Sequence, residues 1–270
     1  MSASDHVHQP RLPPELEQDI FLLAIEQTNK NLSDTLNFIL VAKRVHDWLI
    51  PKIFNIVIFN DNEASPTPFQ LSTFQRYAKH VQHLFLEPHT LVQHLSLFVN
   101  VTNLVLWREF DASQLEVLLT FNHLTRLSIA ISNNITPSPI YFTLFSKLTH
   151  LDLISSCKSW SPAIISPLIN FPLLTHLCIL TGSNIEVIKL FLDQNWCSNL
   201  RVVVLWGSAE MVPVVPPPPW MGRDGFPVED ERFFYVLCRE TIRDWESGAK
   251  GGDDMWKVAD RYLASCKGSI

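Results

Sequence analysis

Residues 148–153 read Leu148-Thr149-His150-Leu151-Asp152-Leu153, and their pattern L-x-x-L-x-L recurs along the middle of the chain. The same spacing of Leu, Val or Ile returns at residues 81–86, 101–106, 124–129, 174–179 and 200–205. Successive copies begin 20, 23, 24, 26 and 26 residues apart, and a phenylalanine stands three positions before four of them. One copy could arise by chance in an apolar chain, but six at near-constant spacing indicate an internal repeat.

The length of the repeat is that of leucine-rich repeats, in which each unit forms a short strand followed by a return segment. Positions four and six of the motif point to one side of the strand, and positions three and five point to the other. One unit cannot bury its own apolar side, so neighbouring units stack. We therefore expect an α/β fold, an irregular leucine-rich-repeat solenoid of parallel strands over residues 54–210, with a weaker first copy at Ile53, Ile56 and Ile58.

The N-terminal part of the chain has a different periodicity. Residues 1–11 are polar and are expected to form a disordered tail. Residues 12–53 contain three short helical patterns, and Leu16, Ile20 and Leu23 share one face of the first. The plainest interpretation of this three-helix segment is a cover for the first repeat.

The part that follows the repeats is also distinct. Residues 211–228 should form a proline-rich loop, because proline cannot donate to a strand ladder or continue a helix. Residues 229–270 are expected to contain a strand at 232–237 and then a capping helix at 253–267, with Asp253 as its N-cap. Solenoids need such a cover at each end.

Composition excludes several classes of function. The 270 residues carry a formal net charge of −6, which argues against a nucleic-acid partner, and the apolar runs are too short to predict a membrane partner. The five scattered cysteines suggest reduced thiols and a cytoplasmic or nuclear location. The chain lacks G-x-S-x-G, H-E-x-x-H and phosphate-binding glycine motifs, so we expect no catalytic residues, no metal site and no cofactor.

Two stretches resemble a known family. Leu12-Pro13-Pro14-Glu15-Leu16-x-x-x-Ile20 is similar to the opening of an F-box, and Leu40-Val41-Ala42-Lys43-Arg44-Val45 is similar to its second half. The family usually has a large aromatic residue at position 45, and here Trp48 follows one turn later. Together with tail features at 244–246 and 251–256, the chain resembles the F-box-like proteins of mushroom-forming fungi, which carry degenerate leucine-rich repeats.

The resemblance implies a non-enzymatic role in ubiquitin transfer. In that family the F-box binds the small adaptor of a cullin–RING (SCF-type) ubiquitin ligase, and the repeats hold a protein substrate. Carried over to this chain, the adaptor-binding residues are Leu12, Pro13, Leu16, Ile20, Leu40, Val41, Val45 and Trp48. An alternative function is a leucine-rich-repeat interaction scaffold with no link to a ligase.

The residues that point away from the core of a leucine-rich solenoid form its concave surface, which is the expected substrate site. Its predicted binding residues combine aromatic, basic and polar side chains typical of interface hot spots. They are His83, Phe85, Trp107, Arg126, His150, Asp152, His176 and Trp206. The sequence leaves open whether this surface is free or is covered by the proline-rich loop or the C-terminal strand and helix.

Overall fold

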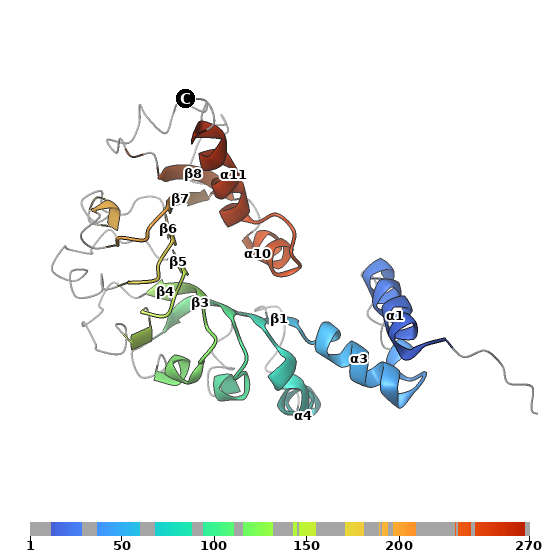
Figure 1. Ribbon diagram of the computed structural model, residues 1–270. Helices are drawn as coiled ribbons and strands as arrows, with labels where there is room; N and C mark the ends of the chain where they lie inside the picture. The colour runs from blue at the N-terminus through green and yellow to red at the C-terminus, as the bar shows by residue number, and fades with distance from the viewer. Residues whose placement is uncertain are drawn as a thin grey trace, which may run out of the picture. The chain divides into compact units, whose positions relative to one another are not determined.

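The computed structural model (Figure 1) describes residues 12–28, 37–59, 68–87, 94–110, 116–131, 143–144, 146–154, 171–180, 189, 191–193, 197–208, 230, 232–238 and 241–267. The chain divides into two compact units, Met1–Asn55 and Ile56–Ile270, which we call the helical unit and the sheet unit. The predicted tail at 1–11 and the predicted proline-rich loop at 211–228 lie outside the described residues.

The helical unit packs helix α1 (Pro14–Thr28) against helix α3 (Lys43–Ile53). Val45 and Leu49 of α3 are fully buried and pack with Ile25 of α1. Helix α3 contains Pro51 in its last turn and continues to Ile53. Of the second predicted helix, the structure describes only a helical turn at residues 37–39.

The sheet unit is an α/β structure built on one sheet whose strands follow the order of the sequence. Every strand pairs in parallel with the next one along the chain. The strands are β1 (Ile56–Phe59), β2 (His83–Leu86), β3 (Asn103–Phe110), β4 (Arg126–Ile131), β5 (His150–Leu153), β6 (His176–Leu180), β7 (Val202–Ser208) and β8 (Phe233–Cys238). The predicted strand at 232–237 is thus confirmed as β8. Sequential parallel pairing requires a return segment between each pair of strands.

Positions one, four and six of all six motifs lie in one apolar core, as the repeat predicts. In β3, for example, Leu104 and Leu106 are fully buried, and Val101 before the strand is buried with them. The phenylalanines that precede the motif at positions 98, 121 and 171 join the same core. We call this side of the sheet the core face.

The first strand departs from the predicted register by one residue. Val57 pairs with Leu84 and Phe59 with Leu86, so Val57 and Phe59 occupy positions four and six of the motif. The expected motif at Ile53, Ile56 and Ile58 was therefore wrong, because a shift of one residue moves every side chain of a strand to the opposite face. Phe59 is buried in the core, whereas Ile56 and Ile58 are only partly buried.

A column of threonines at position two links the turns that precede the strands. The hydroxyl of Thr125 donates to the Thr102 carbonyl at 3.3 Å, that of Thr149 to Thr125 at 3.1 Å, and that of Thr175 to Thr149 at 3.0 Å. The same carbonyl oxygens accept the backbone N–H groups of the next repeat. This ladder joins successive turns by hydrogen bonds at positions that are exposed or partly buried.

Helical pieces occupy the return segments on the outside of the curved sheet (Figure 1). They are α4 (Pro68–Tyr77), the 3-10 helix η1 (Ala78–His80) and the 3-10 helix η3 (Glu116–Thr120). Phe74 of α4 packs edge-on against Phe59, with ring centroids 4.7 Å apart. These pieces close the core face from the side opposite to the C-terminal helices.

Two helices, α10 (Thr241–Ala249) and α11 (Met255–Lys267), end the described chain and lie on the inside of the arc of strands (Figure 1). Helix α11 matches the predicted C-terminal helix, whereas α10 was not predicted. Trp256 and Ala259 of α11 pack with Cys178, Val202 and Val204, and none of them belongs to the main core. The helix therefore covers a face of the sheet, and its expected role as an end cap is not what its contacts show.

Candidate functional site

The inside of the arc, which we call the concave face, carries the side chains at positions three and five of the motif. Strand register aligns position three as a row that runs from His83 to His176, and position five as a row from Phe85 to Val204. Seven of the eight predicted substrate-binding residues have described side chains, and all seven belong to β2 through β6. The side chain of Trp206 in β7 lies outside the described residues.

Helix α10 attaches to one half of this face through Trp245. The indole Nε1–H donates to Asn103 Oδ1 at 3.2 Å, and the ring lies edge-on to Phe85 with centroids 5.6 Å apart. Phe85 in turn stacks on Trp107 at 6.0 Å. The indole thereby satisfies its polar edge and buries its apolar ring in one contact, which is typical of an anchoring tryptophan.

Helix α11 attaches to the other half through an aromatic and imidazole cluster. The rings of His150 and His176 stack with centroids 4.1 Å apart, and Trp256 meets both edge-on at 5.4 and 5.6 Å. His176 Nε2 also lies 3.2 Å from Asp260 Oδ1. Burial, the neighbouring His176 and Arg126 lower the pKa of His150 to about 2, so His150 is neutral at pH 7.

The turn between α10 and α11 is held by a carboxylate and two glycines. Gly251, at φ +83, and Gly252 donate to Gly248 and Ser247 carbonyls in the Schellman pattern that ends helices. Asp254 then caps α11 by accepting the Lys257 N–H at 2.9 Å, so the expected cap at Asp253 was wrong by one residue. Asp254 also lies 3.4 Å from Arg126 Nη1, and a side chain on Gly248 would overlap its carboxylate.

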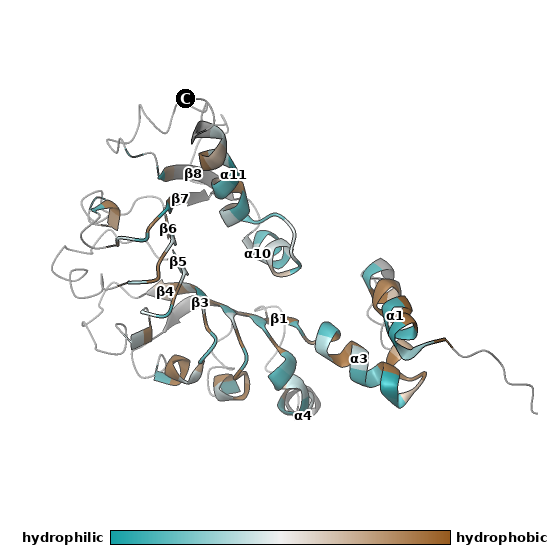
Figure 2. Cartoon of the chain, viewed as in Figure 1, coloured by the Kyte–Doolittle hydropathy of each residue, from teal (hydrophilic) through white to brown (hydrophobic). Residues whose placement is uncertain are grey.

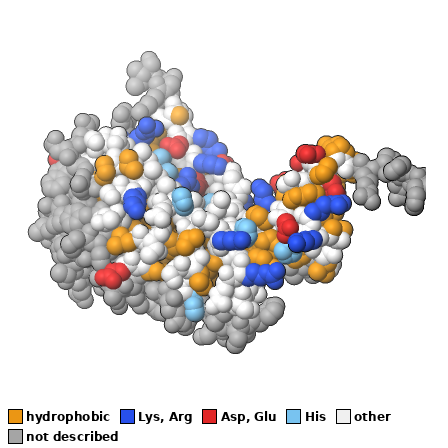
Figure 3. Space-filling model, turned by 60° about the horizontal axis from the view of Figure 1, so that its bottom comes forward, with side chains coloured by type: hydrophobic (Ala, Val, Ile, Leu, Met, Phe, Trp, Pro, Cys, Tyr) orange, Lys and Arg blue, Asp and Glu red, His pale blue; other side chains and the backbone are white. Residues whose placement is uncertain are grey.

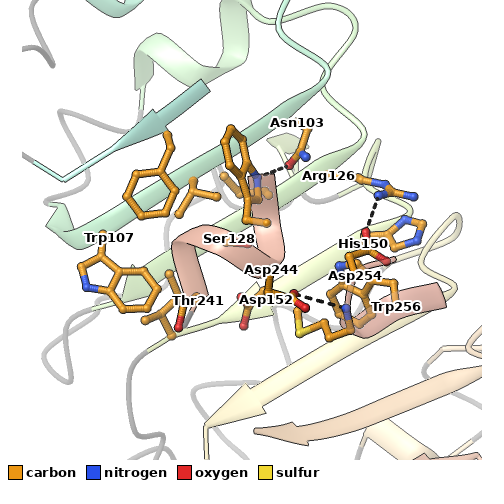
Figure 4. Close-up of a pocket in the computed structure, with 16 residues that line it drawn as sticks. Asn103, Trp107, Arg126, Ser128, His150, Asp152, Thr241, Asp244, Asp254 and Trp256 are labelled. Carbon is orange, nitrogen blue, oxygen red and sulfur yellow. Dashed lines mark hydrogen bonds and ion pairs between the residues drawn. The ribbon is translucent and has the colours of Figure 1, made fainter. Parts of the chain in front are cut away.

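A pocket remains between α10, the start of α11 and strands β2 to β5 (Figure 4). Its volume of about 40 Å³ has room for roughly three water molecules. Aromatic walls and carboxylates meet there, together with hydroxyl and amide groups. The residues that line the pocket include Phe85, Trp107, Trp245, Trp256, Asp152, Asp244, Asp254, Arg126, Ser128 and His150.

The surroundings of two pocket carboxylates, Asp152 and Asp244, disfavour their ionised forms. Burial, opposed by hydrogen bonds from Cys178 and Ser128 and reinforced by the charge of Asp244, raises the pKa of Asp152 to about 6. Burial also raises the pKa of Asp244, as does the charge of Asp254, while a hydrogen bond from the Met255 N–H opposes the rise. Both groups would be stabilised by a cation within the pocket.

The concave face is therefore covered by the C-terminal helices in the part that the structure describes. Phe85, Asp152 and His176 are buried, and His83, Trp107, Arg126 and His150 are partly buried. The sequence left open whether this surface is free or covered. In the structure the C-terminal helices cover it, and the proline-rich loop lies outside the described residues. In the described part of this face, the pocket remains as a cavity, and the partly buried side chains keep some of their surface exposed.

The predicted adaptor-binding residues fall into two groups. Leu12, Leu16, Ile20, Leu40 and Val41 have exposed fractions of 51% to 80%, and Pro13 is also exposed. Val45, by contrast, is fully buried, and Trp48 packs against the same small core. Val45 thus supports the packing of α1 on α3, and its predicted role as a direct contact is not supported by its place in the core.

Helix α1 is apolar on two opposite faces (Figure 2). Phe21, Leu22 and Ile25 pack toward α3. Leu16, Ile20 and Leu23, on the other face, are each more than half exposed. This second apolar face of α1 is left exposed, and an exposed apolar helix face is suited to a partner.

Residues that sequence reasoning missed as site residues come from the C-terminal segment. Asp244, Trp245, Asp254 and Trp256 meet the concave face, although their only signal was their resemblance to tail features of a fungal family. Among the described residues, no group of three or more His, Cys, Asp and Glu side chains could hold a metal ion. No helix in the described ranges has the length and apolar character needed to cross a membrane.

No protein-family model matches this chain, and no curated protein is similar enough to count as a relative.

Proposed function

We propose that this chain is the substrate-recognition subunit of a cullin–RING ubiquitin ligase. The helical unit binds the ligase adaptor, and the sheet unit, an irregular leucine-rich-repeat solenoid, binds a protein substrate. Such a subunit acts in the cytoplasm or nucleus and performs no chemistry of its own.

The observation that carries the proposal is the exposed apolar face of the helical unit. Of the large apolar side chains that are exposed in the described residues, six belong to this unit, and the sheet unit contributes four. The six are Leu12, Leu16, Ile20, Leu23, Leu40 and Val41. Orange side chains are accordingly visible on the surface of the helical unit (Figure 3). Single exposed apolar residues need no explanation, but Leu16, Ile20 and Leu23 share one face of α1, and such a set marks an interaction surface.

The rest of the helical unit is built to hold that face in place. Its core of Ile25, Val45 and Leu49 faces away from the exposed side chains of α1, and Arg44 joins α3 to Glu17 of α1 through an ion pair of 2.7 Å. A small rigid helix pair that presents leucines and an isoleucine suits binding in the apolar groove of a partner.

The repeat motifs support the solenoid part of the proposal. Strands in sequence order, parallel pairing, and buried side chains at positions one, four and six are what stacked leucine-rich repeats require. The threonine column at position two adds hydrogen bonds between successive repeats.

A binding assay with the purified ligase adaptor tests the function. The full chain should retain the adaptor in a pull-down, and Leu16→Asp with Ile20→Asp should weaken retention at least tenfold, because central apolar contacts dominate such interfaces. Both residues are exposed, so the variant should keep its fold, as circular dichroism can verify. Leu173→Asp is the matched control, since Leu173 is 52% exposed in the sheet unit.

Failure of the intact chain to bind the adaptor would refute the ligase role. The alternative of a repeat scaffold without a ligase link then becomes the better account, because the pocket and the concave face do not depend on the adaptor. Retention of the adaptor by the double variant would show that the contact lies elsewhere, contrary to the proposal.

A further inference from the structure

We propose that the pocket beneath α10 binds the ammonium end of a lysine side chain from a protein partner. The inference deepens the proposed function, because it names the chemical group that the sheet unit would recognise. It rests on that function in one respect only, namely that the partner is a substrate of the ligase.

Asp152 and Asp244, two of the carboxylates that line the pocket, come from different elements, and neither forms an ion pair with a cation among the described residues. Asp152 extends from β5, where its partners are the side chains of Ser128 and Cys178 on the neighbouring strands. Asp244 extends from α10 and accepts the backbone N–H of Met255 at 3.2 Å. Figure 4 shows both side chains in the middle of the site, between Trp107 and Trp256.

The other charged groups around the pocket do not neutralise this pair. Arg126 is the cation that lines it, and its Nη1 lies 3.4 Å from the carboxylate of Asp254. His150 is neutral at pH 7, because burial and the neighbouring His176 lower its pKa. Among the described residues that line the pocket, three carboxylates thus face one guanidinium, and the excess is negative. Asp152 is only 9% exposed, so its charge has little water around it and attracts a cation strongly.

The walls of the pocket suit an alkyl chain that ends in a positive charge. Phe85, Trp107, Trp245 and Trp256 line it together with the carboxylates. Aromatic faces attract cations and pack well against methylene groups. A volume of about 40 Å³ admits a compact ammonium group with its last methylenes, whereas a guanidinium is wider and planar and has five donors to satisfy.

Other occupants fit this chemistry less well. Anions are repelled by the excess of carboxylates, and a neutral polar group would leave Asp152 and Asp244 in mutual repulsion. A metal ion is not favoured either, because no ligand set of three His, Cys, Asp or Glu side chains occurs in the described ranges. The lysine ammonium supplies three donors and one positive charge at a single point.

Titration of the full chain with Nα-acetyl-lysine amide tests the inference, with the indole N–H signals of Trp107, Trp245 and Trp256 followed by NMR. We expect saturable shifts of these signals and at least tenfold weaker binding for Asp152→Asn, because a charge-assisted hydrogen bond is lost. Asp47→Asn is the control, since Asp47 belongs to the helical unit, does not line the pocket and has a side chain that is 61% exposed.

The pH dependence of binding provides a second test of the inference. Binding by the wild type should strengthen between pH 5 and pH 7.5 as Asp152 ionises, and Asp152→Asn should lose this dependence. Absence of saturable shifts, an equal response to Nα,Nε-diacetyl-lysine amide, or tighter binding of the arginine analogue would each overturn the assignment. The probe does not involve the adaptor, so failure here and failure of the adaptor pull-down are distinguishable.

Discussion

The core face and the concave face of the sheet alternate along the same strands, yet they are stabilised in different ways. On the core face, Leu151 and Leu153 of β5 meet only apolar neighbours in a continuous core. On the concave face, His150 and Asp152 of the same strand meet histidine, tryptophan and carboxylate groups. The comparison shows that the repeats pack on one another through the apolar core face. The concave face is free of that role and makes contacts that include polar and aromatic side chains.

The faces also differ in what covers them. Return segments close to each strand in sequence cover the core face, as Phe74 of α4 does beside Phe59. The concave face is covered by helices that are far from their partners in sequence, as in the hydrogen bond of Trp245 to Asn103, 142 residues apart. Contacts of such sequence separation cost more loop entropy to form and are the easier ones to lose.

The largest expected effect comes from the core face. Leu104→Ala should lower the free energy of unfolding by about 2–5 kcal/mol, because Leu104 is fully buried and the cavity would be lined by packed side chains. Chemical denaturation followed by circular dichroism measures the change. Leu173→Ala, at a leucine 52% exposed, should change it by less than about 0.5 kcal/mol. Equal effects of the two substitutions would contradict a core built on this face.

Loss of a concave-face anchor should have a smaller and more local effect. Trp256→Ala removes the contact with His150 and His176, and burial of such a side chain contributes about 1.5–3 kcal/mol. Hydrogen exchange should accelerate in α10 and α11 while β3 to β5 stay protected. Val258→Ala, on the same helix but 37% exposed, serves as the control. Loss of protection throughout the sheet would show that the two faces are not independent.

The smallest effect, and one of opposite sign, is expected at Asp152. The pKa of this carboxyl rises from 3.8 to about 6 on folding, so its ionised form destabilises the fold. The destabilisation is smallest below about pH 3, where the group is protonated in both states, grows between about pH 4 and pH 6, and is complete above about pH 6. Asp152→Asn should therefore gain little over the wild type at pH 4 and exceed its stability at pH 7.5 by roughly 1–2 kcal/mol.

Denaturation curves across that pH range measure the difference, with Asp260→Asn as a control that should show no such gain. A stability difference that is the same at pH 4 and pH 7.5 would mean that Asp152 does not titrate against the fold. A gain in the stability of Asp152→Asn at high pH would agree with a pocket whose carboxylates a bound cation would stabilise.

The core face was predictable because its signal is local and repeated. Each L-x-x-L-x-L motif shows which residues of its own strand turn inward, and all six motifs were placed correctly. The weaker copy failed by one residue, because Ile56, Val57, Ile58 and Phe59 are all apolar and a run without alternation does not show its own phase. Pairing with β2 decides the register there.

The candidate site was predictable only in part. The rows of His83, Arg126, His150 and His176 followed from the motif, whereas the residues that cover them did not. Helix α10 was not predicted, although its sequence is amphipathic, and none of its residues is fully buried. Exposed leucines on α1 were expected as a shared face, but the sequence did not show which of the two apolar faces of α1 packs on α3.

By itself the amino-acid sequence determined the strands, their parallel order and the composition of the core, because strand alternation and the repeat length act between neighbours. Only the tertiary structure decided that α10 and α11 cover the concave face and bring Asp244 opposite Asp152. It likewise decided that Val45 is buried while Leu16 and Ile20 are exposed. The reason is that these features depend on contacts between segments far apart in the chain, which no local pattern encodes.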